Sequence, residues 1–172
     1  MYISNLEPAM RPADAFARGK LVRDKLPLPA MPGKLIVVER EERTFLDTAN
    51  YARYDAVVAA FAEMDTAALA RWYLRYEPLL QQAYAELGNG DARVRDAILG
   101  GIALVLAAPV PAGELELTQP AVFYKYADPA LESLPDSQKL LSRMGPRNRA
   151  IIVAQLQRLR ESGIIYAKTN GH

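Results

Sequence analysis

Basic side chains gather around a Met-Gly-Pro turn in the last third of the chain. The stretch QKLLSRMGPRNR contains Lys139, Arg143, Arg147 and Arg149. A helix that begins at Pro146 would place Arg147 and Arg149 in its first turn, where the helix dipole favours negative charge. Free backbone amides and two guanidinium groups there could together bind an anion or a phosphoryl group. Alternatively, Glu132 or Asp136 could pair with these arginines.

The same turn allows two other interpretations. A DNA-reading helix-turn-helix would present residues of its second helix outward, here Arg147, Asn148, Arg149 and Gln155. A purely structural corner explains the turn as well, because glycine suits the position after one helix and proline the first position of the next. We favour the structural corner, and we keep its arginines as the first place to look for a ligand.

The aromatic residues offer a second kind of surface. One group consists of Trp72, Tyr73, Tyr76, Tyr84, Tyr124 and Tyr126. For most of this group, helical spacing favours a core position over a binding face. Tyr51 and Tyr54 precede the first predicted capped helix and could be exposed. We therefore predict a binding surface drawn from the basic corner or from these two tyrosines, with the candidate residues Lys139, Arg143, Arg147, Arg149, Arg158, Arg160, Tyr51 and Tyr54.

The sequence lacks the side chains that several kinds of catalytic or metal site require. Cysteine is absent and the one histidine is His172, so thiolate chemistry, Cys-based zinc sites and histidine triads are excluded. The RGK and PGK stretches lack the upstream glycine and the Ser or Thr of a P-loop. Carboxylates remain, but no pair stands out among Glu63, Glu77, Glu86, Asp96, Glu114, Glu116 and Asp128. We predict no cofactor and no metal, and we expect a domain without catalytic activity.

The length, hydrophobic content and net charge of the chain limit its fold class and its partners. A chain of 172 residues with 51% hydrophobic residues suits one domain with a real core. The net charge of +1 gives no overall field toward polyanions, so there is no strong nucleic-acid signal. The longest apolar run, Ala97 to Pro109, is too short to span a bilayer, and no signal peptide is visible.

Local patterns predict the elements. Residues 1–33 are rich in proline and basic residues and indicate an arm or linker; residues 34–172 would form one domain. A β-hairpin is expected from Leu35–Glu39 and Arg43–Leu46. The helices are expected after Asp55, after Asp65, after Asp91, after Asp128, at 135–144 and at 146–162, and two short extended pieces at 114–118 and 122–126. The fold class is thus α+β, mainly α, with four to five packed helices and a small N-terminal hairpin.

Four stretches resemble a known family in order and spacing. They are LDTANYARYD, YEPLLQQAYAELG, YKYADPALESL and SQKLLSRMGPRN. The family is the bacterial domain of unknown function 3014, and the likeness runs from about Arg18 to Glu161. The resemblance implies an envelope protein with an N-terminal membrane helix and a Pro-rich linker, but it transfers no site residues. This chain departs from that pattern, since its sequence predicts no membrane span.

These observations favour a non-catalytic protein-interaction module associated with the cell envelope, whose protein partner and compartment are unknown. Two alternatives remain open: a small-ligand binder or carboxylate-based enzyme, and an anion or nucleic-acid binder that uses the basic corner.

Overall fold

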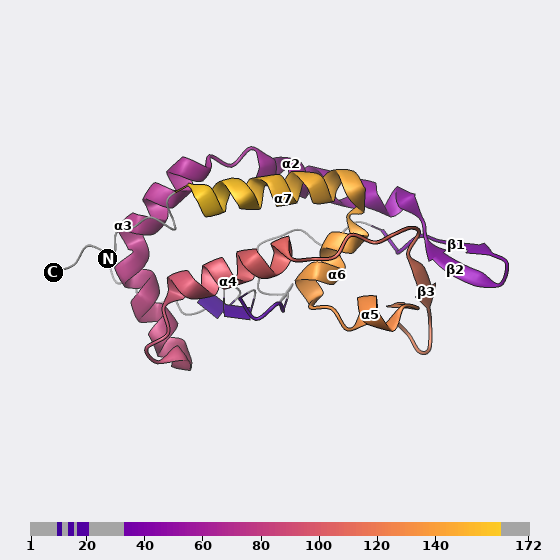
Figure 1. Cartoon of the computed structure of the whole chain (residues 1–172), viewed down its shortest axis with the longest axis horizontal. Coiled ribbons are helices and arrows are strands. Elements are labelled where there is room, and N and C mark those ends of the chain that lie inside the picture. The colour runs from indigo at the N-terminus through magenta and orange to yellow at the C-terminus, as the bar shows by residue number, and fades with distance from the viewer. Residues whose placement is uncertain (1–9, 12–13, 16, 21–32, 163–172) are drawn as a thin grey trace.

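The computed structural model describes residues 10–11, 14–15, 17–20 and 33–162 (Figure 1). Most of the predicted arm, including its proline-rich stretch, lies outside the described residues. Asp14, Ala15 and Ala17 have helical backbone, and Met10 is buried in the main core. The boundary between arm and domain at residue 33 stays a prediction.

The helices form most of the described chain. They are the 3₁₀ segment η2 (Thr48–Tyr54), α2 (Asp55–Ala62), α3 (Thr66–Tyr84), the π-helical segment η3 (Ala85–Asn89), α4 (Val94–Leu106), α5 (Pro129–Glu132), α6 (Asp136–Arg143) and α7 (Gly145–Glu161). A small antiparallel sheet lies at one end of this elongated arrangement (Figure 1). The predicted class, α+β with a helical majority, is confirmed. No helix among the described residues is long and apolar enough to cross a membrane.

The predicted hairpin forms two strands of the sheet. β1 (Val37–Arg40) pairs with β2 (Arg43–Leu46), and Glu41 and Glu42 between them have φ angles of 50° and 60°. Two positive φ angles are what a two-residue hairpin turn needs to match the strand twist. The sequence predicts this turn without an Asn-Gly signal, and the two glutamates adopt it nonetheless.

The two later extended pieces complete the same sheet. β3 (Glu116–Thr118) pairs with β2, and β4 (Lys125–Tyr126) pairs with β3, which gives the order β1-β2-β3-β4. Exposed ion pairs reinforce the β2–β3 side, since Arg43 binds Glu116 and Arg40 lies 2.9 Å from Glu114. The sheet covers a small core of its own, made of Leu46, Leu115, Leu117 and Tyr126.

Two of the four predicted aspartate caps are confirmed. The Asp65 carboxylate accepts hydrogen bonds from the amides of Ala67 and Ala68 at the start of α3, and these bonds lower its pKa. The Asp128 carboxylate accepts a bond from the Ala130 amide at the start of α5. In both cases an acidic side chain satisfies amides that the helix itself leaves free.

The caps predicted at Asp55 and Asp91 are wrong. Asp55 is the first residue of α2 and caps nothing, because η2 already supplies the preceding turn and is itself capped by Asp47. At α4, the side chain of Gln81 on α3 replaces the expected cap: its amide oxygen accepts a bond from Val94 N at 2.9 Å. The first turn of α4 is thus capped by a side chain from another helix, and not by the nearby aspartate that the sequence predicts.

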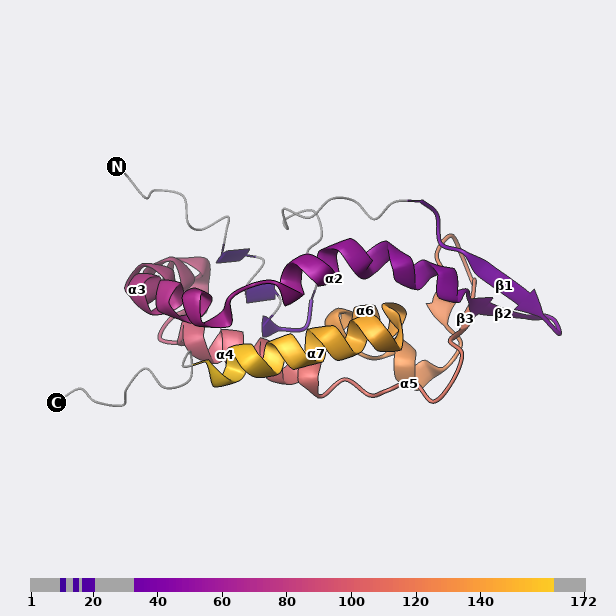
Figure 2. The same cartoon turned by 90° about the horizontal axis from the view of Figure 1, so that it is seen from above.

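α7 is the central helix of the molecule. It packs against α2, α3, α4 and α6, and both views show it beside α2 along the long axis (Figure 2). Tyr73, Tyr84 and Tyr126 are buried as predicted. The prediction is wrong for Trp72, which is 52% exposed and lies against Tyr76 with a ring separation of 5.3 Å. The predicted apolar stripe of α3 is wider than the face that the neighbouring elements cover, so a residue at the edge of the stripe remains in solvent.

A single glycine makes the corner between α6 and α7 possible. Gly145 is buried and has a φ of +79°, a left-handed conformation that glycine adopts without strain. The Tyr51 ring of η2 lies directly on it, so a Cβ atom at this position would overlap with the ring. The Met-Gly-Pro turn therefore has the structural role that we favour from the sequence.

We expect Gly145→Ala to destabilise the fold by about 2–4 kcal/mol, because left-handed strain adds to a clash with the Tyr51 ring. Gly88→Ala is the matched control: Gly88 has a φ of +88°, but an added Cβ would meet nothing within 4 Å. The Gly88→Ala variant should lose only the free energy that the left-handed strain costs, about 1–2 kcal/mol. The measurement is chemical denaturation of both variants, and equal losses would contradict the close contact with Tyr51.

Candidate functional site

Two buried amides on α7 fasten it to the η2–α2 segment. The Asn148 side chain is 3% exposed and donates hydrogen bonds to the Tyr51 carbonyl at 3.0 Å and to Asp55 Oδ1 at 2.8 Å. The Gln155 side chain is also buried and donates to the Met64 carbonyl at 2.8 Å. The outward orientation that a DNA-reading helix would give these two residues is therefore wrong.

The two arginines in the first turn of α7 each have a protein partner. Arg149 is partly buried and donates to the carbonyls of Ala108 at 2.5 Å and Pro109 at 3.1 Å, just beyond the end of α4. Burial lowers the pKa of its guanidinium. Arg147 is exposed, and its nearest carboxylate is Asp55 at 3.9 Å. The predicted pairing with Glu132 or Asp136 is not observed, and Arg149 instead donates to two carbonyls of the segment that follows α4.

Lys139 and Arg143 on α6 also have internal partners. The Lys139 ammonium lies 3.8 Å from Glu132 and 3.5 Å from Asp136. The Arg143 guanidinium lies 5.0 Å from the centre of the Tyr126 ring and donates to its hydroxyl at 3.1 Å. Burial raises the pKa of Tyr126, and Arg143 opposes this rise. An arginine over an aromatic face is a favourable cation–π arrangement that still leaves other N–H groups available.

The remaining predicted residues are spread out. Arg158 and Arg160 are exposed in the last turns of α7, about 20 Å from the corner at 1.5 Å per helical residue. Tyr54 is only 6% exposed, so its expected exposure is wrong, and Tyr51 is half-buried on Gly145. Burial, and secondarily Glu114, raises the pKa of Tyr51. The eight candidate residues therefore do not form one continuous face.

Four of the eight residues gather at two hollows on the surface. A corner cleft of about 320 Å³ includes Tyr51, Arg149, Val110 and Glu114. A second hollow of about 430 Å³, which we call the sheet-end pocket, includes Tyr54 and Arg143. The other side chains that matter at the sheet-end pocket are Leu35, Arg53, Val122 and Phe123.

The sheet-end pocket combines unpaired positive charge with exposed apolar surface. Arg53 donates to the Gly33 carbonyl at 3.0 Å and to Asn50 Oδ1 at 3.3 Å, while its buried Nε has no hydrogen-bond partner among the described residues. Among the described residues, no carboxylate forms an ion pair with Arg53 or Arg143. Val122 and Phe123 at the same pocket are 78% and 79% exposed.

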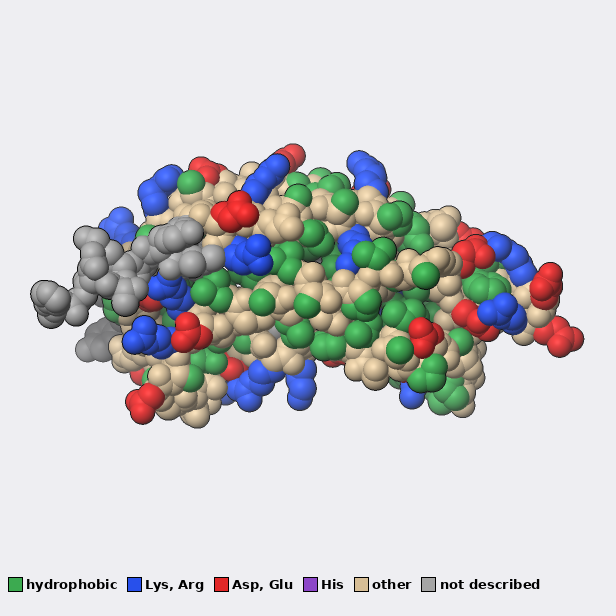
Figure 3. Space-filling view, in the orientation of Figure 1, with side chains coloured by type: hydrophobic (Ala, Val, Ile, Leu, Met, Phe, Trp, Pro, Cys, Tyr) green, Lys and Arg blue, Asp and Glu red, His purple; other side chains and the backbone are tan. Residues whose placement is uncertain are grey.

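Hydrophobic side chains are also visible among charged ones at the sheet-bearing end of the molecule (Figure 3). Ile36, 47% exposed, follows the pocket residue Leu35, which is 37% exposed. Clustered exposed apolar residues often indicate a binding surface, whereas single ones do not. Sequence reasoning missed Arg53, Val122 and Phe123 here. A signal was present, because Val122 and Phe123 are adjacent apolar residues in the piece predicted to be extended at 122–126.

Within the described part of the chain, no group of three or more His, Asp or Glu side chains could hold a metal ion. The carboxylates Glu114 and Glu116 form ion pairs with Arg40 and Arg43, so both already have partners within the chain.

The profile of a family described as "Protein of unknown function (DUF3014)" matches residues 8–160. The chain belongs to this family. The resemblance seen in the four sequence stretches is thus confirmed, and the match includes every residue of both hollows in the DUF3014 domain. No curated protein and no solved structure matches the chain.

We expect Asn148→Ala to destabilise the DUF3014 domain by about 1–3 kcal/mol, because it leaves the partly buried Tyr51 carbonyl without a donor. The neighbouring Arg147→Ala is the control, since this side chain is 81% exposed and its ion pair is long. It should change the free energy of unfolding by less than about 0.5 kcal/mol. Urea denaturation of both variants checks this, and a neutral Asn148→Ala would contradict a structural role for the side chain.

Proposed function

We propose that this DUF3014 domain is a non-catalytic protein-interaction module of the cell envelope, and that its sheet-end pocket binds a partner segment with an acidic side chain beside an apolar one. The observation that carries the proposal is the pocket's composition. Arg53 and Arg143 lack carboxylate partners among the described residues, and Val122 and Phe123 expose their apolar side chains beside them.

The charge at the pocket supports an acidic partner. A carboxylate in the sheet-end pocket would lie near the guanidinium groups of Arg53 and Arg143, which have no carboxylate partner among the described residues. Arg143 is fixed over the Tyr126 ring, so little side-chain entropy remains to be lost on binding. Charged hydrogen bonds to a guanidinium are among the stronger polar contacts, and arginine is enriched at interface hot spots.

The apolar residues support a protein partner over a simple anion. An inorganic anion would leave Val122 and Phe123 in water, whereas a hydrophobic side chain next to the acid would cover them. Aromatic and aliphatic anchors beside arginine are typical of the centre of protein interfaces.

The other functions considered from the sequence have less support. Anion or nucleic-acid binding at the corner would have to compete with the Ala108 and Pro109 carbonyls for Arg149 and with the Asp55 carboxylate for Arg147. Carboxylate chemistry would have to separate Glu114 and Glu116 from their arginines.

The binding test is selection of peptides from a random displayed library on the folded domain, followed by affinity measurement. We expect selected peptides to carry Asp or Glu next to an aliphatic or aromatic residue. Val122→Ser combined with Phe123→Ser should weaken their binding by about tenfold or more, as removal of interface anchors does. Arg143→Gln should weaken it as well, and added salt should reduce the affinity of the parent domain.

The matched control is Val110→Ser, because Val110 is 73% exposed at the other hollow. It should leave peptide affinity unchanged. Selected peptides that bind all these variants equally well would place the interaction elsewhere.

The envelope association is tested separately by fractionating cells that express the natural gene, and recovery only with cytosolic markers would overturn that part of the proposal.

A further inference from the structure

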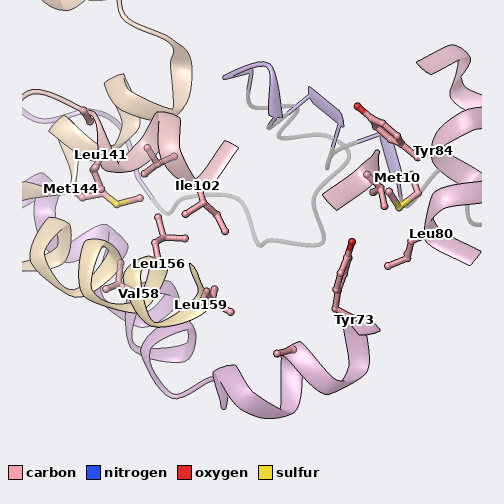
Figure 4. Close-up of a cluster of buried hydrophobic side chains, with 14 of the residues drawn as sticks. Met10, Val58, Tyr73, Leu80, Tyr84, Ile102, Leu141, Met144, Leu156 and Leu159 are labelled. Atoms are coloured by element: carbon pink, nitrogen blue, oxygen red, sulfur yellow. The ribbon is translucent and has the colours of Figure 1, made fainter. Parts of the chain in front are cut away.

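A third hollow lies between the helices and shares no lining residue with the sheet-end pocket. It measures about 340 Å³ and is lined by side chains of α2, α4, α6 and α7, among them Phe61, Ile102, Leu141, Ile152 and Leu156. Figure 4 shows Ile102, Leu141, Met144 and Leu156 directed toward a common space. We call this space the helix cleft. Its volume is at the lower end of the range for small-molecule sites, which is roughly 300–1,000 Å³.

One polar side chain interrupts the apolar lining. Ser137, near the start of α6, is 5% exposed, and its Oγ is buried without a hydrogen-bond partner among the residues that the structure describes. Two other buried polar side chains of α6 do have hydrogen-bond partners. Gln138 is equally buried and donates to the Leu104 carbonyl at 2.6 Å, and Ser142 Oγ donates to the Gln138 carbonyl at 3.1 Å. Buried hydroxyl groups are normally paired, so an unpaired one at a cleft indicates a missing partner.

Water is a poor candidate for that partner. A buried water molecule needs two to four polar groups, whereas Ser137 is the one hydroxyl-bearing side chain among the described residues that line the cleft. Apolar cavities instead remain dry and accept apolar molecules. The occupant must therefore be mostly hydrocarbon, with one oxygen that can bond to the serine.

We propose that the helix cleft binds a neutral single-chain amphiphile, such as a medium-chain alcohol or ester. Its chain would lie among the leucine and isoleucine side chains, and its oxygen would bond to Ser137 Oγ. We expect a neutral head group because, within the described part of the chain, no lysine, arginine or histidine lines the cleft. An ionised carboxylate there would lose its hydration without gaining a counter-charge.

The test is isothermal titration calorimetry of the full chain with 1-decanol, and with decanoate at pH 8 as the charged comparator. We expect saturable 1:1 binding of decanol and at least about tenfold weaker binding of decanoate, in line with the cost of burying an unpaired charge. Ser137→Ala should weaken decanol binding by roughly 2- to 10-fold, the value of one neutral hydrogen bond. Ser142→Ala, whose hydroxyl is already paired, should not change it.

A second pair of variants tests the location without relying on the hydroxyl. Ile152→Phe should fill the cleft and reduce decanol binding, whereas Ile151→Phe, on the same helix but not among the lining residues, should not. Circular dichroism checks that each variant is folded. Absence of saturable decanol binding to the parent chain would overturn the proposal, as would equal affinity for decanoate or equal binding by Ser137→Ala. The peptide experiment above does not bear on this result, because the two sites share no lining residue.

Discussion

The contact between the Tyr51 ring and Gly145 joins the two parts of this molecule. Tyr51 follows the hairpin through η2, and Gly145 begins the central helix α7, so their contact holds the sheet against the helices. The missing side chain at position 145 allows the ring to approach the backbone, and the left-handed φ turns the chain from α6 into α7. Asn148, one turn further on, donates to the Tyr51 carbonyl and fixes the same junction.

This junction also decides which basic residues remain available. Because α7 lies against α2 and α4, Arg149 reaches the carbonyls that follow α4. Because α6 lies beside the sheet end, Arg143 lies over Tyr126 and borders a pocket with Arg53. The basic residues around the corner are neighbours in sequence, but packing gives them different roles. Buried donors must find acceptors close to them, so some of these side chains hold the structure together and others remain available for a ligand.

The two proposed sites use different parts of the architecture. The sheet-end pocket borders the small core under the sheet, whereas the helix cleft lies in the main helical core. The first exposes charge and apolar side chains together and suits a protein segment. The second has one unpaired hydroxyl in an apolar lining and suits a small neutral molecule. An elongated domain with two cores can accommodate both without overlap (Figure 1).

The sequence by itself determined the features that depend on near neighbours. The hairpin and the caps of Asp65 and Asp128 follow from spacing, because the interacting groups lie within a few residues of one another. Most of the tyrosine core follows from helical periodicity, and the glycine corner follows from the residue types at the turn. The candidate site was predicted only in part, because Arg143 was named but Arg53, Val122 and Phe123 were not. Tertiary structure alone decided that β3 pairs with β2, that Gln81 replaces the Asp91 cap, that Trp72 is exposed and that Ser137 is left without a partner. Each of these depends on which distant segment packs beside the residue, and no local pattern specifies that neighbour.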